Sequence, residues 1–306
     1  MASLWMLFST FAFAAMGVCV KLASGMYSTS EMVMYRGMIG VLLLYPMIRH
    51  QGGTLRTHHP RAHLWRSVIG VCSLWLWYFA IAELPLAMAM TFNYMSPIWM
   101  AFILLCAGWW TAKNHVELPL LGAILFSFIG VTLVLRPAIE AEQWLGAMMG
   151  LASSVITAFA YLQVRKLGRM GEPEYRVVFY FSATTIVAGF IGALLTGRGA
   201  EPAFHAHTWE GAALLVATGF FALGGQFGMT RAYRLGKVLV VANLQYTGII
   251  FSSTFGVLIW HDVFDWYVWA GMGLVLVSGV AATFYNTRNT PRGPAISKTD
   301  PIASEP

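Results

Sequence analysis

The sequence contains uninterrupted apolar stretches that are long enough to cross a membrane. A helix needs about 20 apolar residues to span the roughly 30 Å of bilayer hydrocarbon. The runs are continuous rather than alternating, which favours helices over barrel strands. The last seven stretches contain no Asp, Glu, Lys or Arg. We expect ten spans, at about residues 3–24, 32–48, 67–84, 86–108, 118–135, 144–164, 177–196, 211–230, 238–260 and 266–286.

The apolar content is too high for a soluble protein of this size. Of the 306 residues, 58% are hydrophobic and only 10% are charged, more than a water-soluble core can bury. The first stretch has no preceding Lys or Arg, so we expect a true helix rather than a signal peptide. The predicted fold class is therefore an all-α integral membrane protein.

Basic residues predict the orientation of the chain. With the N-terminus in the cytoplasm, fifteen Lys and Arg fall on the cytoplasmic side, while only Arg136 and Arg198 fall outside. Cytoplasmic loops carry such an excess, so both termini are predicted to be cytoplasmic. This topology accounts for the formal net charge of +6. The expected partners are membrane lipids, and the positive charge does not require a nucleic-acid partner.

The second half of the chain resembles the first. A shift of 151 residues lays Pro97 on Gly248, and the pair Lys21-Leu22 recurs as Lys166-Leu167. Each half holds five predicted helices, an odd number, so the second copy must enter the membrane from the opposite side. Inverted repeats of this kind are a recurring architecture of secondary transporters. The predicted units are 1–143 and 144–286 as the two repeats, and 287–306 as a disordered cytoplasmic tail.

Helix-breaking residues at matching positions of two repeats point to a transport pathway. Pro97 and Gly248 occupy such positions in the fourth and ninth spans. The alternative is that membrane helices simply carry more Pro and Gly than soluble ones.

Few ionisable residues fall within the predicted spans. Lys21 and Arg36 lie inside the outer ends of the first two, and Glu83 lies at an outer boundary. They are candidates for a gate or for an anchor that holds a substrate carboxylate. The alternatives are snorkelling to the headgroups, or pairing of Arg36 with Glu31 or Glu83. Because no carboxylate lies deep in a span, facilitated diffusion or exchange is favoured over proton coupling through a buried acid.

Amide and aromatic side chains within the spans predict a polar, aromatic-lined cavity. Each one alone is also explained by hydrogen bonding between helices. Trp75 and Tyr78 are three residues apart, so they share a helix face. The candidate substrate-binding residues are Trp75, Tyr78, Asn93, Tyr94, Tyr161, Tyr180, Gln226, Asn243, Gln245 and Tyr246.

No cofactor or metal site is predicted. The three cysteines fall inside spans, where a thiol behaves as a small hydrophobe. The loop around His58-His59 lacks the spaced Cys and His pattern of a metal site. Gly236-Lys237 lacks the following hydroxyl residue and the upstream Gly spacing of a phosphate loop.

Several short strings resemble a known family over about residues 3–286. They are Lys21, Tyr35-Arg36-Gly37, the run from Ala82 to Ala87, Ser96-Pro97, the run from Leu244 to Gly248, and Asp262. On these the chain resembles the drug/metabolite transporter superfamily, EamA-like branch. The resemblance implies ten helices in two inverted five-helix repeats. It also implies a central cavity lined by helices one to four and six to nine. Many members carry an acidic residue after the fourth helix, where this chain has Gly108-Trp109-Trp110-Thr111.

The predicted function is secondary active or facilitative transport of a small organic solute across the bacterial inner membrane. An amino acid or related metabolite is the leading solute class, and import and export both remain open. A lipid flippase of the same fold is the alternative. A membrane-embedded enzyme or a sensor is disfavoured, because the spans lack clustered acids or histidines and the tail is short. A homodimer packed through span glycines is left open.

Overall fold

The computed structural model describes residues 2–110, 122, 125–126, 129–134, 143–196, 202–236, 241 and 244–289. Within these ranges the chain is helical and contains no strand, as the sequence predicts. The helices are α1 (Ala2–Ala23), α2 (Thr29–His50), α3 (Pro60–Glu83), α4 (Leu86–Asn93), α5 (Ser96–Trp110), α7 (Trp144–Arg169), α8 (Glu174–Thr196), α9 (Trp209–Leu235), α11 (Thr247–Phe255), the π-helix η1 (Gly256–Trp260) and α12 (Trp266–Asn289).

Six helices are long and apolar enough to cross a membrane: α1, α2, α3, α7, α8 and α9. Shorter apolar helical segments cover residues 247–260 and 266–278. Large side chains such as Leu42, Val187 and Phe220 are exposed on the outside of these helices, where a bilayer would cover them. About half of the predicted span at 118–135 lies outside the described residues, so the ten-helix count stays a prediction.

The fourth predicted span is divided into two helices. Residues 86–108 were expected as one helix, but α4 ends at Asn93 and α5 begins at Ser96. The cause is Pro97, whose ring clashes with the carbonyl of the residue four positions earlier and which lacks an N–H. That earlier residue is Asn93. The chain thus leaves helical geometry at Tyr94 and Met95.

The third helix begins earlier than expected. The sequence placed its start at residue 67 and counted Arg66 among the loop residues, but α3 begins at Pro60. Proline suits the first turn of a helix because the N–H that it lacks would have no partner there. The earlier start places Arg66 inside a membrane helix, where its side chain is buried.

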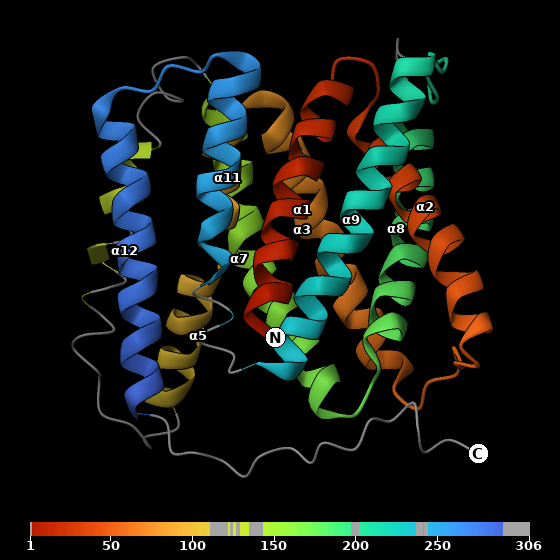
Figure 1. Ribbon diagram of the computed structural model, residues 1–306, viewed down its shortest axis with the longest axis horizontal. Helices are drawn as coiled ribbons and strands as arrows, with labels where there is room; N and C mark the ends of the chain where they lie inside the picture. Colours follow the sequence, from red (N-terminus) through yellow and green to blue (C-terminus); the bar gives the residue numbers. More distant parts are fainter. Residues whose placement is uncertain are drawn as a thin grey trace.

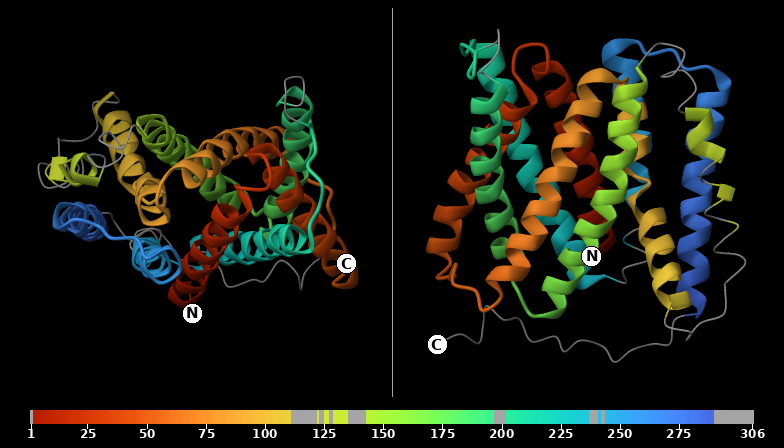
Figure 2. Two further views of the ribbon diagram at one scale, coloured as in Figure 1. Left: turned by 90° about the horizontal axis from the view of Figure 1, so that it is seen from above. Right: turned by 180° about the vertical axis from the view of Figure 1, so that it is seen from behind.

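The main helix pairs join the first half of the chain to the second. Helix α1 packs on α9, α3 on α7 and α2 on α8, and Figures 1 and 2 show the first two pairs side by side. A hydrogen bond from Ser9 Oγ to the Gly225 carbonyl, at 2.7 Å, joins α1 to α9. At Gly189 the backbones of α8 and α2 are so close that a Cβ would meet the Met34 backbone. Small residues allow such close packing in membranes.

Candidate functional site

A cavity of about 60 Å³ lies among helices from both halves of the chain. One water needs about 10–15 Å³ of such space, so the cavity has room for a small polar group. Its apolar wall includes Phe13, Leu74, Trp77, Phe181 and Met229. Its polar wall consists of Arg36, Arg66, Ser73, Asn93, Tyr94, Thr157, Tyr161 and Gln226.

Two arginines enter the cavity from different helices. Arg36 of α2 is 5% exposed and Arg66 of α3 is 3% exposed. Their guanidinium carbons lie 5.1 Å and 4.4 Å from the ring centre of Phe181 on α8. The Arg66 side chain extends along its own helix toward the C-terminus and lies over Gly70, where any side chain would meet its Nη1 atom. The lack of a side chain at Gly70 therefore leaves space for the Arg66 guanidinium.

Two of the candidate tyrosines lie where the fourth and ninth spans meet. Tyr94, at the interruption between α4 and α5, is 2% exposed and its ring covers Gly248 in the first turn of α11. Tyr246 directly precedes α11 and is equally buried. Neither hydroxyl has a hydrogen-bond partner within the described ranges. Of the two, only Tyr94 lines the cavity.

A hydrogen-bonded group of side chains fixes one wall. Gln245 donates from Nε2 to Tyr161 Oη at 2.9 Å, and its Oε1 accepts from Tyr233 at 3.3 Å. Tyr161 lines the cavity, as do the candidates Asn93 and Gln226. Gln245 therefore supports the cavity from behind by positioning Tyr161. Asn243 lies outside the described residues.

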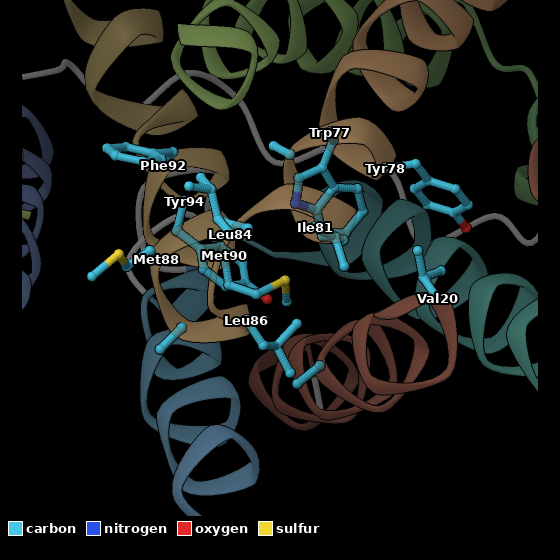
Figure 3. Close-up of a cluster of buried hydrophobic side chains, with 14 of the residues drawn as sticks. Val20, Trp77, Tyr78, Ile81, Leu84, Leu86, Met88, Met90, Phe92 and Tyr94 are labelled. Carbon is cyan, nitrogen blue, oxygen red and sulfur yellow. The ribbon is translucent and has the colours of Figure 1, made fainter. Parts of the chain in front are cut away.

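Three other aromatic candidates point elsewhere. Trp75 packs against Gly192 of α8, and the Tyr78 hydroxyl contacts Met16 Sδ of α1 at 3.4 Å. Figure 3 shows Tyr78 pointing away from the part of the apolar cluster that holds Tyr94. Tyr180 donates to the Leu55 carbonyl at 2.9 Å, near the start of α8. The structure does not bring these three side chains to the cavity wall.

Lys21 stabilises a helix end. Its Nζ donates to the carbonyls of Ile81 at 3.1 Å and of Leu84 at 2.5 Å, at the C-terminus of α3. A cation is favourable there because the last carbonyls of a helix lack intrahelical partners and carry partial negative charge. Glu83, in the last turn of α3, is exposed. Neither side chain lines the cavity.

Polar contacts join the helices on one side of the cavity, where α1 leads into α2. Glu31 of α2 accepts from the His205 backbone N–H at 2.8 Å and contacts His205 Nδ1 at 2.6 Å. Tyr35 Oη contacts His207 Nε2 at 2.7 Å. The pairing of Arg36 with Glu31 that the sequence allowed is therefore replaced by a Glu31–His205 pair.

A second polar group lies at the other end, where α7 leads into α8. Arg176 Nη1 donates to Glu172 at 2.9 Å, Thr57 Oγ1 donates to it at 2.6 Å, and His63 Nε2 lies 3.2 Å away. Burial alone would raise the pKa of Glu172, but the contacts from Thr57, Arg176 and His63 outweigh it and hold that pKa below its usual range. Arg234 of α9 pairs with Glu174 of α8 at 2.7 Å nearby.

The sequence interpretation missed several residues of the site. Arg66 was counted as a loop residue, and Ser73, Trp77, Thr157 and Phe181 gave no local signal. Pro60 was the available signal for Arg66, because a proline after a polar loop marks the first turn of a helix. The other four are recognisable only once α3, α7 and α8 are packed together.

Apolar membrane-length helices around a cavity with both polar and apolar walls are typical of multi-pass membrane transporters. Residues 1–136 match the model of the EamA-like transporter family. Over 273 residues the chain is 30% identical to the pseudopaline exporter CntI of Pseudomonas aeruginosa, across 89% of this chain and 92% of that exporter. The chain belongs to the EamA-like transporter family, within the drug/metabolite transporter superfamily that the sequence strings indicated.

More distant relatives cover a similar share of the chain. The riboflavin transporter of Rhizobium johnstonii is 24% identical over 95% of this chain and 92% of its own length. Human solute carrier family 35 member G1 is 23% identical over 90% of this chain and 77% of its own length. A solved protein crystal structure superimposes with a TM-score of 0.65 at 16% identity, over 94% of this chain and 98% of that one. That likeness supports the fold alone.

Proposed function

We propose that this protein is a secondary carrier that moves a small organic solute across the bacterial inner membrane by alternating access. Relatives from bacteria are named as transporters, including an exporter and a riboflavin transporter. The family supplies the general activity. The solute class and the mechanism are argued from the arrangement of this chain's own residues.

The observation that carries the proposal is the position of the cavity between two groups of polar contacts. Helices α1 to α4 and α7 to α9 all contribute lining residues. The Glu31–His205 contact lies at one end of these helices and the Glu172–Arg176 contact at the other. Separating one group while the other holds would open the cavity to one side of the membrane at a time.

The helix pairing supports an inverted repeat with units at 1–143 and 144–286. In such a repeat α1 corresponds to α7, α2 to α8 and α3 to α9. The α1–α9 pair and the α3–α7 pair are then equivalent, and α2–α8 is its own equivalent. The interruptions beside Pro97 and Gly248 fall in corresponding helices, as broken helices do at the substrate sites of other carriers.

Within this proposal the solute contacts Asn93, Tyr94, Tyr161 and Gln226, and Gln245 positions Tyr161. Tyr246 contributes to the hinge between the ninth and fourth spans rather than to the cavity wall. Tyr94 is the most informative of these residues, because it lines the cavity and its buried hydroxyl lacks a partner among the described residues.

The experiment is solute flux into proteoliposomes, measured for the wild type and for Tyr94→Phe. The substitution removes only an unpaired hydroxyl, so the free energy of unfolding should stay within about 1 kcal/mol of the wild type. If the hydroxyl binds solute, flux at low solute concentration falls. Tyr45→Phe, on the exposed side of α2, is the matched control. Absence of saturable flux for every compound, with or without a proton gradient, would reject the carrier function.

A further inference from the structure

Among the described residues, no acidic side chain pairs with either of the two cavity arginines. Arg36 Nε and both Nε and Nη1 of Arg66 are buried without a hydrogen-bond partner in the part of the chain that the structure describes. The described acidic side chains of α2, of the α7–α8 connection and of the start of α8 have other partners. The pairs are Glu31 with His205 at 2.6 Å, Glu172 with Arg176 at 2.9 Å and Glu174 with Arg234 at 2.7 Å.

The ring of Phe181 does not compensate for this burial. Removing a charged group from water costs several kcal/mol even after the protein relaxes. A desolvated cation over an aromatic face recovers about 2 kcal/mol or somewhat more, and here Arg36 and Arg66 share one ring. Their like charges also repel in a medium of low dielectric constant. The site is therefore electrostatically incomplete without a negative group.

The cavity next to these arginines has the features of a ligand site. Its polar side continues from the guanidinium groups to the amides of Asn93 and Gln226, and Trp77 and Met229 lie on its apolar side. A ligand that matches these walls has an anionic end, uncharged polar groups and a short carbon frame. The wall contains no carboxylate from the described residues to receive the ammonium group of a cation or a zwitterion.

Building on the proposed carrier function, we infer that the transported solute is a small organic acid whose carboxylate is held by Arg36 and Arg66. Guanidinium groups match a carboxylate because their planar forks donate two parallel hydrogen bonds to it. Arg66 reaches this position from the third helix because Gly70 leaves space for it. Amines and neutral amides of the same size are excluded or bound weakly.

The test compares three pools of matched compounds in wild-type proteoliposomes. The pools are small mono- and dicarboxylic acids, their primary amides, and the corresponding primary amines, and uptake is read by mass spectrometry of the lumen. The expected result is uptake of acids only. Uptake of amides or amines without acids would overturn the inference and leave the carrier function intact. No uptake from any pool would reject the carrier function and the inference with it.

Arginine variants then test the assigned residues. Arg36→Gln and Arg66→Gln should each lower acid uptake at low concentration by roughly a hundredfold, because the anion loses a buried charged partner. Arg61 is an exposed arginine in the first turn of α3, the helix that also carries Arg66. Arg61→Gln should leave uptake unchanged. Arg36→Lys and Arg66→Lys keep the charge and should retain intermediate uptake, which separates loss of binding from loss of folding. Unchanged acid uptake in both Gln variants would overturn the assignment.

A binding readout separates the soluble acid from an anionic lipid headgroup. The acid pool should raise the thermal unfolding midpoint of the wild type but not of Arg66→Gln, since only the folded site binds the anion. Liposomes with a short-chain fluorescent phosphatidylglycerol report lipid movement in parallel. Arginine-dependent movement of this lipid, without uptake of soluble acids, would overturn the inference in favour of a flippase.

Discussion

Replacing Gly248 with alanine tests the close packing between the fourth and ninth spans. The added Cβ would lie 2.5 Å from Tyr94 Cε2, whereas carbons make favourable contact at about 3.5–4.0 Å. The ring or the start of α11 must therefore move by about 1 Å or more. Tyr94 is too buried to swing aside, so we expect the variant to lose about 1–3 kcal/mol of unfolding free energy, the usual cost of overpacking.

The assay is reversible unfolding in mixed detergent micelles, followed by circular dichroism. A second substitution, Tyr94→Leu, removes the far end of the ring and should relieve the clash. In that background Gly248→Ala should cost less than about 0.5 kcal/mol, which gives a coupling energy within the usual range for residues in contact. Gly273→Ala in α12 is the control, because nothing lies within 4 Å of its Cβ position. An equal cost of Gly248→Ala with and without Tyr94 would refute the packing argument.

Three further predictions concern polar contacts and are measured in the same unfolding assay. Lys21→Met should cost about 1–3 kcal/mol, because the carbonyls at the end of α3 lose their partly buried donor. Glu172→Gln should be less stable than the wild type at neutral pH. The pKa of the Glu172 carboxyl is lower in the folded chain than the unfolded value of 4.5, so the ionised carboxylate stabilises the fold above pH 4.5. This stabilisation disappears as the pH falls through the folded pKa. A stability difference between wild type and Glu172→Gln that persists at low pH would contradict this. Ser153→Ala should cost about 0.6 kcal/mol by removing the 2.9 Å hydrogen bond to the Ser73 carbonyl.

The sequence predicted the helical membrane class and the family, because both depend on local features. Long uncharged apolar runs require helices in lipid, and the strings around Lys21, Arg36 and Glu83 are contiguous in the chain. It also brought Asn93, Tyr94, Tyr161 and Gln226 together as candidates. All four line the cavity.

The rest depends on packing that no local pattern reveals. Trp75 and Tyr78 were expected on one face of the third helix, yet one contacts α8 and the other α1. The two side chains lie on one side of α3 but face different neighbouring helices, and the sequence does not show where those helices are. Phe181 became part of the site because α8 packs against both α2 and α3, which brings its ring to two arginines more than 100 residues earlier in the sequence. Lys21 was interpreted as a gate residue because the end of α3, which it caps, lies 60 residues away.

The pairing of α1 with α9 has a consequence for biosynthesis. Ser9 and its acceptor at Gly225 are 216 residues apart, and Thr10 contacts Thr247 across 237 residues. The ribosome therefore completes most of the chain before the first helix can meet its main neighbour. Until then the hydroxyls of α1 have no native interhelical partner in the bilayer, where unsatisfied polar groups are costly. A nascent chain released before α9 is synthesised lacks the main packing partner of α1, so we expect such truncated products to be degraded faster than the full-length chain.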